Sequence, residues 1–470
     1  MAITIGQYAS NLTMANSDLI WAVTSNSSSR DQFQYICVLR DGCGTTLTTV
    51  KQQPNPSQVG VFDLGRIVKQ YLAYNTDNFQ LTASTFGANN AVGLPMASFF
   101  QVAFGEEYGT SPTSSTSIYN GITNSTTGSP AQTGSVKQYF FIDGVLDPNY
   151  GSWSWDTGSN YLPRPSPYTG SAYSYNVCLT DASRTQYARN DDFMTVSTIN
   201  GNISASATAS QDIYAMYIQV YNATGSVISS SIYYNTGNGC GPRSVESQVW
   251  ANVNGLNTCN TDTDNDIQTR STLILTAGMG PRNITNAGNI NLDTLPWEYY
   301  TVKLVGQQAS EVANLNAIWD QFTIYKTTGN CEYNGVRFAW INDYGVYDWY
   351  TFSLADNKNT SLERGIYKQP FVNYSTTTAT VPYDIKRRGD NSYYVNIREE
   401  FTANSDWLTQ TEADWLDKLF YSPNVYIQDG NNMIPVIITS NAFTSRTNPR
   451  TQKNFQYAIT FTLANNKRSR

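Results

Sequence analysis

Short apolar runs separated by turn-forming residues recur along this chain, and they restrict its fold more than any other feature. Between residues 203 and 330 these runs are Tyr214–Tyr221, Val227–Tyr234, Ser271–Leu275, Tyr299–Val305 and Ile318–Tyr325. Turn formers such as the Asn-Ala-Thr-Gly stretch at 222–225 lie between them. Runs of this length between turn signals are typical of strands, and they predict two packed antiparallel sheets.

The composition also favours strands over helices. Tyr supplies 33 of the 470 residues, and only 14% of the residues are charged, compared with about 25% in an average soluble domain. Tyr and β-branched side chains fit a pleated, half-buried surface. We therefore expect a mainly β protein, with several β-sandwich-like modules in tandem and short helices in the first and last modules.

A chain of this length is too long for one hydrophobic core. We predict four parts: an N-terminal β module with one helix at 1–108, a Ser/Thr-rich segment and second β region at 109–202, a β-sandwich-like domain at 203–330, and a C-terminal β module with a capped helix at 331–470. The stretch 110–135 is rich in Ser, Thr, Gly, Asn and Pro, and is either a flexible linker or a long surface loop.

The two end modules each contain a predicted helix. In the first, apolar residues between Phe62 and Leu72 recur with helical spacing, and Asp63 is the expected N-cap. In the last, Thr409-Gln-Thr-Glu412 is a capping box that begins a helix, and Trp415 and Leu419 should face the core. A hairpin should follow this second helix, with strands at Val425–Ile427 and Met433–Ile438 around a turn at Asp429-Gly430.

The chain contains no histidine. Catalytic systems that need histidine as a base or a metal ligand are therefore excluded within this chain, including Ser-His-Asp triads and HExxH zinc sites. Phosphate-binding loops of the Walker or Rossmann type are also absent from the sequence. We therefore expect a protein that acts through shape and surface and is not an enzyme. We assign no catalytic, cofactor-binding or metal-binding residue.

Paired carboxylates are the one catalytic alternative left open, because two carboxyl groups suffice for glycoside cleavage. The candidate pairs are Glu106/Glu107, Asp191/Asp192, Asp343/Asp348 and Glu399/Glu400. Neighbouring residues on a strand point to opposite faces, so Glu106 and Glu107 should not face each other. A polysaccharide depolymerase built on such a pair is therefore the least favoured interpretation.

Two further patterns resemble binding sites. Asp262, Asp264 and Asp266 have the spacing of a calcium loop, but Ile267 and Leu273 occupy the positions where Gly and Glu are needed, so an exposed acidic loop is preferred. Two aromatic groups would suit stacking on sugar rings, although packing in cores or between subunits is the preferred interpretation. They are Trp153, Trp155 and Tyr161, and Trp340, Trp349 and Tyr350.

Cysteine spacing and charge limit the environment and the partners. Cys37 and Cys43 flank a turn-like segment and would be able to pair under oxidation, but reduced, partly buried thiols are expected. The net charge is −7, so we do not expect nucleic-acid binding. No signal peptide and no long apolar run is visible, so neither export nor membrane insertion is expected.

Six phrases together resemble structural virion proteins of tailed bacteriophages. They are PNPSQVGVFDLGRIVKQYL (54–72), FGEEYG (104–109), IDGVLDPNY (142–150), RTQYARNDDFMTVS (184–197), RFAWINDYGVYDWYTF (337–352) and ADWLDKLFYSPNVYI with MIPVIITS (413–440). The resemblance implies a particle component of the tail, baseplate or fibre-attachment region, assembled in the host cytoplasm. It transfers no functional residues.

The expected partners are further copies of this chain in a symmetric homo-oligomer, together with other virion proteins. A glycan-binding adhesin or receptor-binding protein is the alternative, with a host surface glycan as its ligand. A capsid-associated decoration or head-fibre protein is a further alternative. No cofactor is expected in any of these cases.

Overall fold

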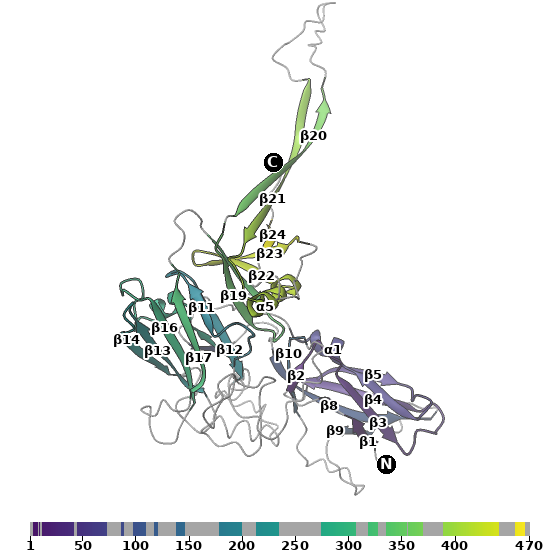
Figure 1. Cartoon of the computed structure of the whole chain (residues 1–470). Helices are drawn as coiled ribbons and strands as arrows, with labels where there is room; N and C mark the ends of the chain where they lie inside the picture. Colours follow the sequence, from purple (N-terminus) through teal and green to yellow (C-terminus); the bar gives the residue numbers. More distant parts are fainter. Residues whose placement is uncertain are drawn as a thin grey trace, which may run out of the picture. The chain divides into compact units, whose positions relative to one another are not determined.

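The computed structural model describes residues 3–7, 9, 12–41, 45–72, 86–88, 97–109, 117–120, 138–145, 178–199, 213–234, 274–306, 318–327, 335–354, 356–369, 389–440 and 456–465. The protein is mainly β with multi-stranded sheets and short helices, which confirms the predicted fold class (Figure 1). The chain forms two compact units. Unit 1 is Met1–Thr328 with Ile341–Asp348, and unit 2 is Gly329–Trp340 with Trp349–Arg470. The finer division into four modules stays a prediction.

Two sheets of unit 1 enclose its first core. One has the order β1 (Ile3–Gln7), β3 (Ile20–Ser25), β6 (Val59–Asp63). The other has the order β2 (Leu12–Met14), β10 (Gln138–Ile142), β8 (Ala97–Glu107), β4 (Gln34–Asp41), β5 (Thr46–Gln52), with β9 (Ser117–Asn120) beside β8. Strand β9 lies within the stretch 110–135, so the prediction of a linker or loop there is wrong for these four residues, which pair with β8. Both sheets contribute to one buried cluster that includes Trp21, Phe62, Tyr35, Phe104 and Phe141. The arrangement is a β-sandwich, because side chains from both inner faces share one core.

The helix of the first module is shorter than the sequence indicates. Strand β6 extends to Asp63, and Phe62 pairs with Trp21 of β3, so the sheet takes the first residues of the predicted helix. Helix α1 is only Gly65–Lys69, and its N-cap is Leu64. Asp63 is therefore not the N-cap, although its carboxylate accepts a hydrogen bond from the Gly65 backbone N–H at 3.0 Å.

Unit 1 also contains a five-stranded sheet and a three-stranded sheet. The larger has the order β11 (Thr185–Ala188), β17 (Ile318–Lys326), β16 (Tyr299–Gly306), β13 (Ile213–Tyr221), β14 (Val227–Tyr234). The smaller has the order β12 (Thr195–Ile199), β15 (Ile274–Gly278), β7 (Phe86–Ala88). Alternate residues of the larger sheet are fully buried, including Met216, Ile218, Val302, Leu304 and Phe322. This period of two gives the sheet one apolar face and one Tyr-, Thr- and Gln-rich face.

A third helix, α4 (Pro281–Asn286), follows β15 and was not predicted. Pro281 occupies its first turn, where the missing N–H has no intrahelical partner to lose. No helix among the described residues is long and apolar enough to cross a membrane.

Unit 2 is built on a seven-stranded sheet, although Ile341, Tyr347 and Asp348 at the ends of two of its strands belong to unit 1. Its order is β19 (Tyr347–Phe352), β18 (Val336–Ile341), β22 (Val425–Asp429), β23 (Asn432–Ile438), β24 (Ala458–Leu463), β21 (Asp390–Asn404), β20 (Asn357–Lys368). The predicted hairpin is β22 and β23, which pair directly.

Helix α5 (Gln410–Tyr421) begins with the predicted capping box. The Glu412 N–H donates to Thr409 Oγ1 at 3.3 Å, and the Thr409 N–H donates to the Glu412 carboxylate at 2.9 Å. Trp415 and Leu419 are buried as expected, and the Trp415 ring lies 5.1 Å from the ring of Trp340 in β18. The helix therefore covers one face of the sheet through the side chains that its apolar spacing predicted.

The strands β20 and β21 form the longest hairpin among the described residues, which we call the ribbon (Figure 1). They pair from Asn357 with Thr402 to Lys368 with Asp390. Among the residues that the structure describes, Phe401–Asn404 are the part of β21 that also pairs with β24. Most side chains of the outer ribbon are exposed.

Candidate functional site

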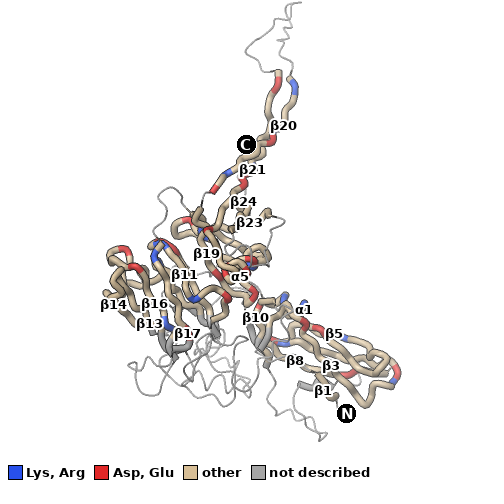
Figure 2. Tube along the Cα trace, viewed as in Figure 1, with Lys and Arg blue, Asp and Glu red and all other residues tan. Residues whose placement is uncertain are grey.

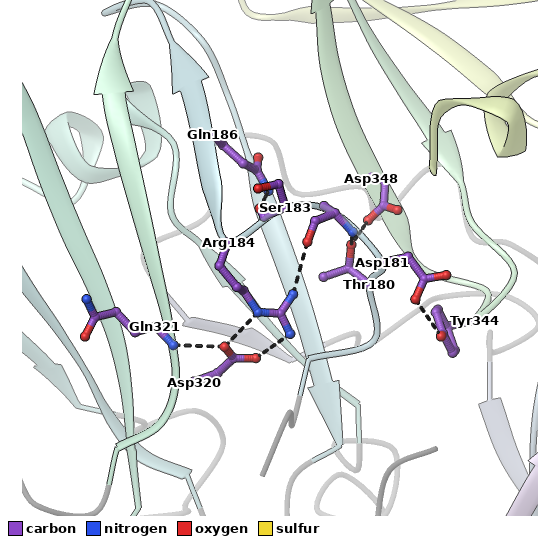
Figure 3. A network of polar contacts seen from close by, with 10 residues as sticks. Thr180, Asp181, Ser183, Arg184, Gln186, Asp320, Gln321, Tyr344 and Asp348 are labelled. Carbon is purple, nitrogen blue, oxygen red and sulfur yellow. Dashed lines mark hydrogen bonds and ion pairs between the residues drawn. The ribbon is translucent and has the colours of Figure 1, made fainter. Parts of the chain in front are cut away.

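A network of polar side chains in unit 1 is centred on the segment Cys178–Gln186, which we call the strap (Figure 3). Arg184, just before β11, makes two parallel hydrogen bonds to Asp320 of β17, at 2.8 and 2.7 Å. Its guanidinium also donates to the Ala182 carbonyl at 3.3 Å and lies 4.7 Å from the centre of the Phe322 ring. This bidentate pair fixes the strap against the parallel β11–β17 edge of the sheet.

The other part of the strap binds the turn Asn342–Val346 and the residue Asp348, which also belong to unit 1 (Figure 3). Thr180 donates its hydroxyl hydrogen to Asp348 at 2.6 Å. Tyr344 donates to Asp181 at 2.9 Å, and the Asn342 amide donates to the Leu179 carbonyl at 2.9 Å. The strap is therefore held on both sides by side chains that are far away in the sequence.

The turn itself is shaped by two residues. The Asn342 side-chain oxygen accepts hydrogen bonds from the backbone N–H groups of Tyr344 and Val346, at 3.0 and 3.2 Å. Gly345 has φ of +76°, and a Cβ there would collide with the Asp143 carbonyl oxygen. Glycine is the residue that adopts this positive φ without strain and has no Cβ to collide with the carbonyl. Next to it, the Val145 N–H donates to the Asp343 carbonyl at 2.7 Å, so the turn also contacts the end of the first sandwich.

Burial shifts the pKa values of titratable groups around the strap. Burial raises the pKa of the Asp320 carboxyl, and Arg184 opposes that rise. Burial is the largest single effect on Arg184 and would lower its pKa. The charge and hydrogen bond of Asp320, together with electrostatic contributions from Cys178 and Asp348, outweigh burial and raise this pKa. Burial also raises the pKa of the Cys178 thiol, and the charge of Asp320 adds to the rise. Cys178 is therefore a neutral thiol at neutral pH and is poorly suited to act as a nucleophile.

Each carboxylate pair considered from the sequence is divided between different structural contacts. Glu106 is fully buried and accepts a hydrogen bond from Ser25, whereas Glu107 forms an ion pair with Lys51 at 2.6 Å. Neighbours on β8 thus point to opposite faces, as the alternation of a strand requires.

The other three pairs are divided in the same way. Asp192 is buried and accepts from the Arg189 N–H at 2.9 Å, while Asp191 is exposed. Asp348 accepts from the strap, and Asp343 contributes its backbone carbonyl to Val145. Glu399 forms an ion pair with Lys358 at 2.8 Å, and Glu400 accepts from Thr439 at 3.1 Å.

The second aromatic group is part of the core of unit 2. Trp340 is fully buried, and Trp349 is 3% exposed with the Arg337 guanidinium 5.5 Å from its ring centre. Tyr350 packs edge-on against Phe352 at 5.3 Å. These rings are occupied by protein contacts, in agreement with the preferred interpretation.

Several predicted features lie outside the described residues: the first aromatic group (Trp153, Trp155, Tyr161), the acidic loop (Asp262, Asp264, Asp266) and Cys43. Cys37 is a buried free thiol, and burial raises its pKa. Within the described ranges, no group of three or more Cys, Asp and Glu side chains is arranged to hold a metal ion.

A row of four tyrosines crosses the polar face of the five-stranded sheet. Strand register places Tyr187 beside Tyr325, Tyr325 beside Tyr299, and Tyr299 beside Tyr221. Successive ring centres are 5.9, 5.3 and 4.6 Å apart. Tyr187 is 60% exposed and Tyr325 is 37% exposed.

The next row of the same face is neutral and polar. Gln219, Thr301, Thr323 and Thr185 occupy the four corresponding positions. Lys303, one row further, donates to Gln219 at 2.9 Å. Hydroxyl and amide groups beside aromatic rings can bind neutral, hydroxyl-rich ligands through hydrogen bonds and ring contacts.

Sequence reasoning missed both the strap and the tyrosine row. Each tyrosine lies near the end of a strand, but only the pairing register brings the four together. A comparison with protein-family models gives no match, and no curated protein matches the sequence. The geometry and the resemblance described above are therefore what supports a function.

Proposed function

We propose that this chain is a non-enzymatic structural component of a tailed-bacteriophage virion. Its place would be the tail, baseplate or fibre-attachment region, where it would act as a symmetric homo-oligomer with other virion proteins. The strap is the observation that carries the proposal. Its buried ionic and polar side chains join segments that are far apart in the chain: Arg184 and Asp320 are 136 residues apart, and Thr180 and Asp348 are 168 residues apart.

The strap and its turn coincide with two of the phrases that resemble virion proteins. The phrase 184–197 begins at Arg184, and the phrase 337–352 contains Asn342, Tyr344, Gly345 and Asp348. These residues stabilise the fold through contacts within the chain. This supports a structural role, in which the protein acts by keeping a stable shape.

The direct test is mass spectrometry of purified phage particles from the source of this sequence. Stoichiometric peptides of this chain are the expected result, and their absence from particles would refute the proposal. Immunogold electron microscopy then shows where in the particle the chain lies. Gold at the tail tip or baseplate supports the preferred site, whereas gold over the head supports the capsid-decoration or head-fibre alternative.

The tyrosine row favours a second candidate function, binding of a host surface glycan. Titration of the full chain with host surface polysaccharide tests it. Tyr187→Ala should weaken binding, because Tyr187 is the most exposed ring of the row. Tyr421→Ala is the matched control, since Tyr421 is 70% exposed but lies on helix α5. Equal affinities for both variants and the unchanged chain would rule out this surface as the binding site.

A further inference from the structure

The outer part of the ribbon is a two-stranded structure. The 12 residues of β20 pair with β21, and at about 3.4 Å per residue this makes a ribbon of roughly 40 Å. Among the described residues, β24 is the only other strand that pairs with β21, and only at Phe401–Asn404. An isolated two-stranded hairpin is marginally stable in water and usually needs another packed layer.

One face of the ribbon continues the core face of unit 2. At its base, Phe401 stacks on the buried ring of Phe461 at 5.4 Å, and Phe461 packs against Phe338 at 5.1 Å. Directly opposite residues lie on the same face, and every second residue returns to it. The pair Leu362 and Ile397 therefore shares the face of Phe401.

Further out, this face is no longer covered, and aliphatic side chains alternate on it with polar ones. The pair Thr360 and Glu399 lies between Phe401 and Leu362, and Glu399 forms an ion pair with Lys358 on the same face. The pair Arg364 and Val395 follows Leu362 and Ile397, and Ile366 comes next along β20. Leu362 is 52% exposed and Ile366 is 62% exposed. We call this surface, from Phe401 to Ile366, the apolar ribbon face, after its exposed aliphatic side chains. Exposed aliphatic side chains on a thin ribbon indicate an interaction surface.

The charges of the ribbon are compatible with a second copy of this chain as the partner. By sequence, unit 1 has 14 basic and 24 acidic residues, a net charge of −10, so the bodies of two copies repel each other. The strands β20 and β21 have four basic and four acidic residues, a net charge of zero. Both signs lie along the ribbon (Figure 2). Two ribbons can therefore meet without net repulsion.

The register adds a specific complementarity. On the apolar ribbon face, the Leu362–Ile397 pair lies between the Arg364–Val395 pair and the Thr360–Glu399 pair. A twofold axis through the central pair brings the Arg364 pair of each copy against the Glu399 pair of the other. Arg364 forms no ion pair with any residue that the structure describes, so its charge is available for this contact, whereas Glu399 pairs with Lys358 of its own copy at 2.8 Å. Arg364 of one copy would therefore join the Lys358–Glu399 pair of the other.

We propose that the apolar ribbon face packs against the same face of a second copy, antiparallel about the Leu362–Ile397 pair. This buries Leu362, Ile366 and Ile397 between two ribbons and places Arg364 beside Glu399 of the other copy. The contact is isologous, so it closes a dimer that can serve as a unit of a larger assembly. The inference rests on the proposed function and deepens it, because it names the surface through which the homo-oligomer forms.

The test measures the mass of the purified full-length chain across a concentration series by analytical ultracentrifugation. Leu362→Asp places a charge in the apolar contact and should weaken self-association at least about tenfold. Ser361→Asp is the matched control, because Ser361 is an exposed neighbour on the opposite face of the same strand. Equal effects of the two substitutions, or a monomeric unchanged chain at every concentration, would overturn the proposal.

A charge exchange tests the antiparallel register. Arg364→Glu alone should weaken the dimer, and the triple variant Arg364→Glu, Glu399→Arg and Lys358→Glu should restore it. The third change keeps an ion pair between positions 358 and 399 within each copy. Failure of the triple variant to restore association would refute this register. Thermal unfolding of each variant checks that it folds, which is expected because Leu362 and Arg364 are exposed.

These results are separable from the test of the proposed function. Particles that contain the chain, together with self-association that is indifferent to Leu362, would refute the ribbon contact alone. A Leu362-dependent dimer of a chain absent from particles would refute the virion role alone.

Discussion

Replacing Arg184 by Met removes one partner of a buried ion pair while keeping an apolar stem over Phe322. Asp320 is 4% exposed, and after the change a hydrogen bond from the Gln321 backbone N–H, at 2.9 Å, still reaches its side chain. Leaving a buried charge without its partner typically costs about 3–5 kcal/mol. We expect a loss of this size in the local stability of β11 and β17.

The assay is hydrogen exchange of peptides that cover 184–199 and 318–326, read as the free energy of local opening. A double variant, Arg184→Met with Asp320→Leu, removes both charges and should recover most of the loss, since apolar replacement of a whole buried pair is often neutral. A loss below about 1 kcal/mol in the single variant, or a double variant no better than the single one, would refute the reasoning.

The same variant should depend on pH in a defined direction. Burial raises the pKa of Asp320, and the variant lacks the guanidinium that opposes this rise. The pKa of an aspartate in the unfolded chain is about 3.9. When the pKa in the folded state is higher, the neutral carboxyl group stabilises the fold below about pH 3.9, and this stabilisation is lost as the pH rises through the folded-state pKa. The stability gap between the Arg184→Met variant and the unchanged chain should therefore widen from about pH 4 towards neutrality. A gap that is constant with pH would show that Asp320 does not stay ionised and buried.

Three further substitutions test the described packing. Leu419→Ala should destabilise unit 2 by about 2–5 kcal/mol, because Leu419 is fully buried. Urea unfolding measures this loss, and a change below about 0.5 kcal/mol would mean that helix α5 packs through a different face. Thr409→Ala should cost about 0.5–2 kcal/mol in the same assay by removing the cap, and Thr409→Ser should not. Gly345→Ala should lower the melting temperature of unit 1, since its Cβ would collide with the Asp143 carbonyl; an unchanged melting temperature would contradict the described turn.

Local signals in the sequence predicted local structure well. The capping box, the hairpin after it and the buried Trp415 each depend on residues within one turn or one strand. The apolar runs likewise predicted β13, β14, β16 and β17, because a half-buried strand shows its period in its own residues.

Features that depend on pairing between distant segments were not predictable in this way. Arg184 and Asp320 are 136 residues apart, so no local pattern joins them. The tyrosine row needs the register of four strands, and two of the neighbouring pairs, β11 with β17 and β13 with β16, are far apart in the sequence. The same cause shortened α1, because Phe62 pairs with Trp21, much earlier in the chain, in preference to starting a helix.

The strand pairing of unit 1 affects how the chain folds during its synthesis. Strand β2 pairs in parallel with β10, and β7 pairs with β15, much later in the chain. Because the turn at Asn342–Val346 and Asp348 also contacts the strap, the last contacts of unit 1 form only after residue 348 has left the ribosome. Until β10 and β15 are made, β2 and β7 lack these partners, and unpaired strand edges favour association with other chains. Slow folding of the N-terminal part is therefore expected from the order in which its partners are made.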